Sequence, residues 1–219
     1  MANRILIFGD SYSTHKDYIP EGYPHYYCTE GRGEDEPVTK MTPEQTWWKR
    51  LIERTGDTLV LNNSWSGSTI GYTGYSGDCS ATSSFIHRYN ELMAAGFFDA
   101  NEVDTIFVFG GTNDSWCNAP LGEEKYSDIK REELFSVRPA ICYFMARLKE
   151  DHPDKKVVFI CNCGLKSEIA ECMRNAAARV GVALIELENI DKQKGHPTIL
   201  GMEQICDQVM AGLKKNEIK

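Results

Sequence analysis

Short runs of apolar residues recur along the chain, each bounded by turn-forming residues. Their hydrophobicity is continuous rather than alternating, which is typical of strands buried on both faces of a parallel sheet. We expect five such strands, at Arg4 to Phe8, Thr58 to Leu61, Asp104 to Phe109, Lys156 to Ile160 and Val182 to Leu187.

Longer segments between these runs carry apolar residues at three-to-four spacing, the period of an amphipathic helix. Thr42-Pro43-Glu44-Gln45 has the form of a capping box with proline at the first helical position, so we expect a helix to begin there. The expected helices are Trp47 to Arg54, Ser83 to Ala95, Glu132 to Glu150, Lys166 to Val180 and Thr198 to Lys215.

This alternation of strand and helix predicts a single α/β domain over residues 1–219, in which helices cover both faces of a five-stranded parallel sheet. The architecture is a three-layer α/β/α sandwich of the doubly wound kind. Ligands of such proteins bind outside the carboxyl ends of the strands. The segments after the strands are therefore where chemistry is expected, and two of them, Tyr12 to Thr42 and Gly71 to Thr82, are long and irregular.

Composition and net charge indicate which classes of binding partner to expect. The 219 residues are 42% hydrophobic and 26% charged, as in an ordinary globular domain, and the net charge is -8. That negative charge opposes binding to nucleic acid or to an anionic membrane surface, so we expect neither. The apolar start of the chain is too short for a signal peptide, so the chain as written is expected to be cytoplasmic; a secreted or periplasmic location stays open if a leader was removed.

The eight cysteines are scattered, and several lie within apolar runs, which is typical of reduced thiols in a protein core. Cys161 and Cys163 form the closest pair, but no second Cys or His pair accompanies them as a zinc site would need. We therefore expect no metal and no other cofactor.

Three strand ends carry residues suited to acyl transfer. Gly9-Asp10-Ser11 follows the first strand, where an α/β fold would present a nucleophile. Gly67 follows the second strand and Asn113 the third, and a backbone N–H with a side-chain amide can stabilise a developing oxyanion. Each of these segments has a plainer interpretation, because each could simply form a turn or cap a helix.

Gly195-His196-Pro197 lies after the fifth strand and just before the last helix. A histidine held at such a junction can reach across the sheet edge and act as a general base toward Ser11. A surface or capping role is the alternative when this residue is considered alone.

Taken together and in this order, the four segments resemble those of the SGNH (GDSL) hydrolase family, over almost the full chain. The resemblance implies a flavodoxin-like SGNH hydrolase fold and a serine esterase in which Ser11 is the nucleophile and His196 the base. It also implies that the N–H groups of Ser11 and Gly67 and the Asn113 side chain form the oxyanion hole.

The chain departs from the family at one position. The family usually has the triad aspartate three residues before the histidine, and here that residue is Gln193. Three groups could orient His196 instead: the Asp191 carboxylate, which ranks first, the Gln193 side chain, or a backbone carbonyl in a Ser–His dyad.

The substrate is less defined by the sequence. Aromatic residues of the irregular segments could stack on a sugar or form a wall for an acyl group; they are those of Tyr12 to Tyr27 and, in other loops, Trp65, Tyr72, Tyr75 and Trp116. We expect a short-chain acyl or acetyl ester, with carbohydrate as the favoured carrier. Two other classes stay open, a catalytically silent binding module on the same scaffold and a flavodoxin-like flavin carrier.

Overall fold

The computed structural model describes residues 2–215, and its centre is one five-stranded parallel sheet. The strands are β1 (Arg4–Gly9), β2 (Thr58–Ser64), β5 (Thr105–Gly110), β6 (Lys156–Cys161) and β7 (Ala183–Glu186). Their order in the sheet is β2-β1-β5-β6-β7, the flavodoxin-like order. The predicted fold class is confirmed. Because the chain reverses direction across the sheet between β1 and β5, the switch point lies beyond the ends of these two strands.

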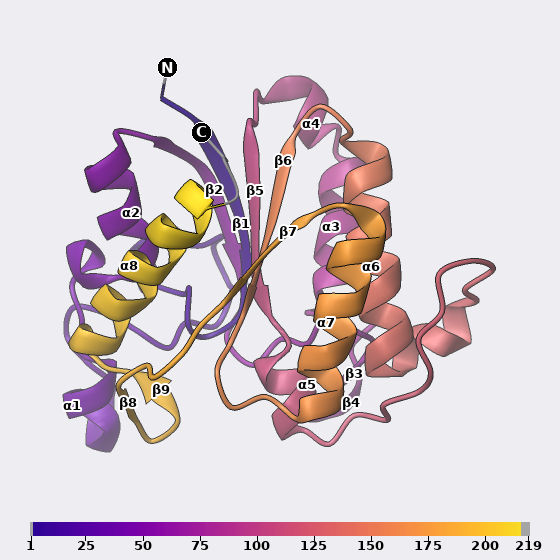
Figure 1. Cartoon of the computed structure of the whole chain (residues 1–219). Coiled ribbons are helices and arrows are strands. Elements are labelled where there is room, and N and C mark those ends of the chain that lie inside the picture. The colour runs from indigo at the N-terminus through magenta and orange to yellow at the C-terminus, as the bar shows by residue number, and fades with distance from the viewer. Residues whose placement is uncertain (1, 216–219) are drawn as a thin grey trace.

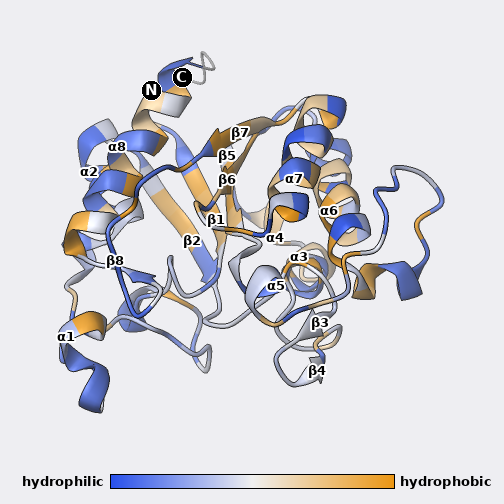
Figure 2. Ribbon diagram, turned by 60° about the horizontal axis from the view of Figure 1, so that its bottom comes forward, coloured by the Kyte–Doolittle hydropathy of each residue, from blue (hydrophilic) through white to orange (hydrophobic). Residues whose placement is uncertain are grey.

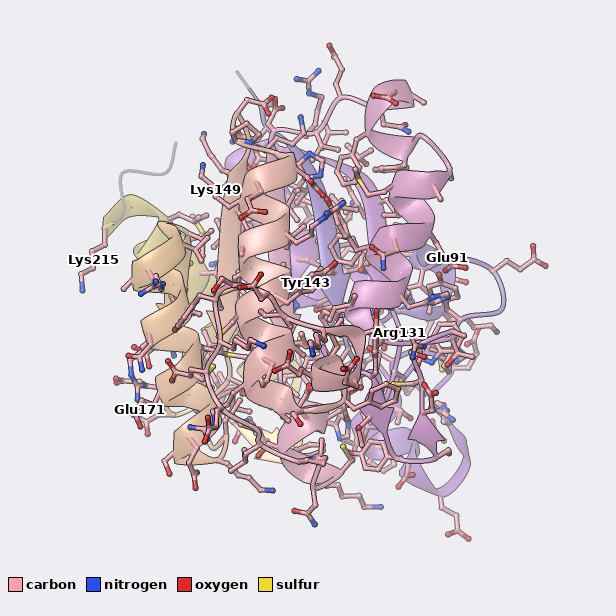
Figure 3. The ribbon with its side chains drawn as sticks, turned by 90° about the vertical axis from the view of Figure 1, so that its right-hand side faces the viewer. Glu91, Arg131, Tyr143, Lys149, Glu171 and Lys215 are labelled. Atoms are coloured by element: carbon pink, nitrogen blue, oxygen red, sulfur yellow. The ribbon has the colours of Figure 1, made fainter. Side chains whose placement is uncertain are left out.

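Helices cover both faces of the sheet (Figure 1). One face is covered by α2 (Trp47–Thr55) and α8 (Ile199–Lys215), and the other by α3 (Phe85–Ala94), α6 (Val137–Asp151) and α7 (Ser167–Val180). Figure 3 looks onto the second face, where α6 lies between α7 and α3 and the exposed side chains of Glu91 and Glu171 point away from the sheet.

Each face of the sheet has its own hydrophobic core, because successive strand residues point to opposite sides. Ile5 and Ile7 pack in the core under α2 and α8, whereas Leu6 and Phe8 pack in the core under α3, α6 and α7. In Figure 2 the strands are accordingly apolar along most of their length, and the helices turn hydrophilic faces outward.

Two helix starts differ from the expected ones. The capping box at Thr42 is present, but it opens a 3-10 turn (Pro43–Gln45), and α2 begins after a second cap at Thr46, whose side chain accepts from the Lys49 N–H. The segment expected as one helix from Glu132 divides into a 3-10 turn (Arg131–Phe135) and α6. Pro139 lies in the first turn of α6, and proline is tolerated in a helix only there, so the helix cannot extend further back.

Several short elements lie in segments expected to be irregular. They are the helices α1 (Glu36–Thr39), α4 (Phe97–Ala100) and α5 (Thr112–Trp116), the 3-10 turns Lys16–Tyr18 and Gly33–Asp35, the hairpin of β3 (Thr73–Gly74) and β4 (Gly77–Asp78), and the hairpin of β8 (Lys192–Gln193) and β9 (His196–Pro197). Figure 1 shows α1, α5 and both hairpins gathered at one end of the sheet. Among residues 2–215, no helix has the length and apolarity needed to cross a bilayer.

Phe144 of α6 is the centre of the core on its face. Its side chain is fully buried, and its ring meets those of Phe8, Phe85, Tyr89 and Phe159 at centroid distances of 5.9 to 6.3 Å. We expect Phe144→Ala to lower the free energy of unfolding by about 3–5 kcal/mol, because the ring leaves a cavity that these neighbours cannot fill. Urea unfolding followed by circular dichroism measures the change. Leu200→Ala on the exposed side of α8 is the control, and an equal loss there would contradict the assignment.

Candidate active site

The sequence segments expected to carry chemistry meet at the carboxyl edge of the sheet. Ser11 follows β1, Gly67 follows β2, Asn113 lies in α5 directly after β5, and His196 begins β9. The carboxyl end of β1 is tightly packed: a Cβ atom on Gly9 would lie 2.4 Å from Ser64 Oγ and 2.5 Å from Ser13 Cβ. Only glycine fits there, so the packing of β1 against its surroundings fixes where the chain turns into Ser11.

Ser11 and His196 are in direct contact. Ser11 Oγ lies 3.0 Å from His196 Nε2, and the serine is almost fully buried while the histidine is partly buried. If the hydroxyl donates to Nε2, the neutral imidazole carries its own proton on Nδ1, and that N–H needs an acceptor. The acceptor in reach is the Lys194 carbonyl, whose oxygen lies 3.2 Å from Nδ1.

A tight hairpin brings this carbonyl to the imidazole. Gln193 of β8 pairs with His196 of β9, so Lys194 and Gly195 alone form the turn, and both have positive φ angles (48° and 79°). Such angles are typical of the type I′ turn, which matches the twist of a two-stranded hairpin. Tyr12 Oη donates to the Gly195 carbonyl at 2.5 Å and holds the turn against the end of β1.

The structure does not bring Asp191 to His196. The Asp191 carboxylate accepts from the Thr198 hydroxyl, and its carbonyl accepts from the Thr198 N–H at 3.1 Å, so this residue closes the base of the hairpin. Gln193 has an exposed side chain and faces His196 through backbone pairing. Of the three groups considered from the sequence, the backbone carbonyl is the one in contact with Nδ1.

The residues expected to form an oxyanion hole also lie at this edge. Neither the Ser11 N–H nor the Gly67 N–H has a hydrogen-bond partner within residues 2–215. Asn113 Nδ2 donates one of its two hydrogens to the Ser68 carbonyl at 2.9 Å, and its Oδ1 accepts from Tyr75 Oη at 3.1 Å. The Ser68 carbonyl can only accept, so it fixes Nδ2 as the end of the amide that faces it, and the second Nδ2 hydrogen stays available.

A buried arginine joins the strand ends through its hydrogen bonds. The sequence motifs do not include this residue. Arg88 of α3 is fully buried, and its guanidinium donates to the Gly9 carbonyl (3.2 Å), the Ser68 hydroxyl (3.1 Å) and Asn63 Oδ1 (2.9 Å). Burial lowers the pKa of Arg88 to about 10, so it stays cationic at neutral pH. Its position in the sequence could have indicated its burial, because Arg88 lies three residues after Phe85 on the apolar stripe of its helix.

Two buried aspartates support the loops around Ser11. Asp114 accepts from the Ile70 N–H at 3.0 Å and the Gly71 N–H at 3.3 Å, while Asp10 accepts from the Tyr12 N–H at 3.0 Å. Burial raises the pKa of Asp114 to about 6 and that of Asp10 to about 7. Their contacts are to backbone N–H groups, so both aspartates brace these loops.

Aromatic rings surround the imidazole. Tyr26 stacks on His196 with ring centroids 3.6 Å apart and an angle of 8° between the planes, and Trp116 approaches at 5.7 Å and 73°. Burial lowers the pKa of His196, and the nearby Lys192 ammonium lowers it further, against the raising effects of the Lys194 carbonyl and of Asp35. Lys192 is held by Asn162 Oδ1 and the Cys163 carbonyl, each 3.0 Å from Nζ.

The aromatic residues expected to line the site differ in exposure. Trp65 is half-buried, and its ring packs against that of Tyr23 with centroids 4.5 Å apart. Tyr12, Tyr27 and Tyr72 are buried and support the backbone; Tyr27 Oη, for example, donates to the Pro197 carbonyl at 2.7 Å. Tyr75 (58% exposed) and Trp116 (41% exposed) present their rings to solvent next to Asn113 and His196. Within residues 2–215, no three His, Cys, Asp or Glu side chains gather as a metal site would require.

Comparison with known proteins places this arrangement in a family. A family model described as GDSL-like Lipase/Acylhydrolase matches residues 3–213. No curated protein matches the sequence.

Solved structures agree with the family match. Two candidate GDSL-like lipases, from Bacteroides ovatus and Bacteroides uniformis, are each 38% identical to this chain with a TM-score of 0.88. The matches cover 98% of this chain in both cases, and 99% and 96% of those chains. An acetyl xylan esterase from Butyrivibrio proteoclasticus shares the fold at 14% identity and a TM-score of 0.63, over 98% of this chain and 64% of that one. The protein therefore belongs to the GDSL-like lipase/acylhydrolase family and is a hydrolase that acts on esters.

Proposed function

We propose that this protein is a serine esterase that works through an acyl-enzyme on Ser11, with His196 as general base. The observation that carries the proposal is the 3.0 Å contact between Ser11 Oγ and His196 Nε2 at the switch point of the sheet. That separation is within the range over which a base can take the hydroxyl proton.

The reaction follows the general scheme of serine hydrolases. As Ser11 Oγ attacks the ester carbonyl, its proton passes to His196 Nε2 and the carbonyl electrons move onto oxygen. The resulting oxyanion would be bound by the Ser11 and Gly67 N–H groups and by Asn113 Nδ2. The tetrahedral intermediate then collapses, the alcohol leaves with the proton from His196, and water repeats the sequence to release the acid.

In this proposal the Lys194 carbonyl orients the His196 imidazole, as the acid of a catalytic triad would. Its oxygen, 3.2 Å from Nδ1, selects the tautomer in which Nε2 is the free base. Unlike a carboxylate it carries no full charge, so it stabilises the imidazolium less. Asp191, which accepts from Thr198, would then have a structural part in the hairpin and no part in the proton transfers.

The proposed substrate is an ester of a short acyl or acetyl group, in which a carbohydrate supplies the alcohol. The exposed ring of Trp116 lies beside His196 and that of Tyr75 beside Asn113, so both could stack against sugar faces. The acetyl xylan esterase of the same fold supports this class of substrate by analogy.

Ser11→Ala should abolish hydrolysis of p-nitrophenyl acetate, with kcat/KM falling by at least about 10³-fold, because no other group replaces the nucleophile. A fluorophosphonate probe should label the wild-type protein at Ser11 and leave the variant unlabelled. Ser127→Ala, on an exposed loop residue, is the control. Full activity or labelling in Ser11→Ala would contradict the proposal, and a wild-type protein without turnover of any ester in a broad panel would favour a binding module.

Asp191→Asn should keep kcat/KM within about threefold of wild type, since its side-chain oxygen can still accept from Thr198 and it does not touch His196. A true triad acid would cost about 10⁴-fold. Gln193→Ala should behave like Asp191→Asn, whereas His196→Asn should lose nearly all activity. A loss of 10³-fold or more in Asp191→Asn, with unchanged circular dichroism, would restore this residue as the acid.

The acid limb of kcat/KM should have its midpoint below the ordinary histidine pKa of 6.5, because burial lowers the pKa of His196. The base must be neutral, so activity rises as the pH passes upward through this lowered value. A pH profile between pH 4 and 9 measures the midpoint. A midpoint above 7 would show that the imidazolium is stabilised more strongly than these contacts allow.

A further inference from the structure

The closest contact across the plane of the His196 imidazole is the ring of Tyr26. The two rings are almost parallel and their centroids are only 3.6 Å apart, so they overlap nearly face to face. Neutral aromatic pairs prefer offset or edge-to-face arrangements, because two negative ring faces repel each other. A protonated imidazole removes this repulsion and is attracted by the face of the phenol ring. The stack therefore favours the charged form of His196 over the neutral form.

Other charged groups near the imidazole supply little of this stabilisation. Lys192, from β8, opposes protonation of His196. Asp35, from the segment before α1, favours it, but its carboxylate is exposed and paired with Lys194 Nζ at 2.6 Å. Asp191 is bound to Thr198. Tyr12 lies at 5.6 Å and Trp116 at 5.7 Å, both much farther than Tyr26. No carboxylate within residues 2–215 is hydrogen-bonded or ion-paired to His196.

Hydrogen bonds connect the backbone of Tyr26 to that of Ser11. Its N–H donates to Thr14 Oγ1 at 2.9 Å, and the same hydroxyl donates to the Ser11 carbonyl at 3.1 Å. The edge of its ring also meets Tyr27, with centroids 4.9 Å apart and an angle of 80°. The Thr14 hydroxyl therefore links the backbone of Tyr26 to the backbone of Ser11, so the positions of these two residues depend on each other.

We propose that Tyr26 is a positioning residue that stabilises the His196 imidazolium through its ring face. It supplies a part of the charge stabilisation that a triad carboxylate would give, while the Lys194 carbonyl supplies the orientation. The catalytic part of this inference rests on the proposed esterase function; the electrostatic part concerns His196 alone. Because the attraction grows as the imidazole gains its proton, it lowers the barrier to attack more than it stabilises the resting enzyme.

The test measures the pKa of His196 directly, by NMR titration of the histidine ring signals of the full chain. The protein has five histidines, and loss of a signal in His196→Gln assigns the relevant one. Tyr26→Phe keeps the ring and should leave the pKa within about 0.3 of wild type. Tyr26→Leu removes the ring face and should lower the pKa by about 0.5–1, a size set by exposed to partly buried cation–π contacts.

A shape-matched variant protects the test against a folding defect in Tyr26→Leu. Pentafluorophenylalanine at position 26 keeps the ring but reverses the charge distribution of its face, so it should lower the His196 pKa relative to Tyr26→Phe. An unchanged pKa in both the leucine and the fluorinated variants, or a raised one, would overturn the inference.

Kinetics separate this inference from the proposed function. In Tyr26→Leu, kcat for p-nitrophenyl acetate should fall about 3–10-fold with KM nearly constant, and Tyr26→Phe should keep kcat within about twofold. If the pKa of His196 falls as expected but wild-type protein hydrolyses no ester, the proposed function fails and the electrostatic inference stands. If hydrolysis is normal and the pKa does not move, only the inference fails.

Discussion

The buried guanidinium of Arg88 is the interaction on which the geometry of the site depends. It carries a positive charge into the interior and distributes it over acceptors from the end of β1, the end of β2 and the loop after β2. Parallel strands alone would align these ends only along the sheet. The guanidinium also fixes them toward α3, and removing it would leave the buried side-chain oxygens of Asn63 and Ser68 without their donor. The positions of Ser11 and Gly67 therefore follow from a charge that neither of them contacts.

The second constraint is the hairpin that carries His196. Its turn consists of Lys194 and Gly195, and it is fastened by Tyr12 at the turn, Lys192 on one strand and Asp191 at the base. Hydrogen bonds from three directions thus hold the hairpin on which His196 lies. In the proposed mechanism, a hairpin fastened in this way would let an uncharged carbonyl orient the imidazole, because a weak acceptor selects a tautomer only if its position is fixed.

Much of the fold and part of the site could be predicted from the sequence. All five sheet strands follow from continuous apolar runs, since a strand buried on both faces leaves that pattern whatever its neighbours are. The motif residues Ser11, Gly67, Asn113 and His196 could be predicted because each follows its own strand and the four segments, in this order, resemble those of one family. Lys194 was not, since a backbone carbonyl leaves no trace in residue type. Tyr26 was one tyrosine among several in an irregular segment, and only the folded loop distinguishes it from its buried neighbour Tyr27.

The Lys194 carbonyl has a consequence for how this site can vary. A carboxylate acceptor is lost when its own side chain is substituted, whereas the carbonyl belongs to the main chain. It is retained with any side chain at position 194 that tolerates the positive φ of 48° found there. Its direction depends instead on the left-handed conformation of Gly195, where an added Cβ would also lie 3.1 Å from the Trp116 ring. Under the proposed mechanism, the residue type on which the third member of the site depends is therefore the glycine at position 195 and not an acid.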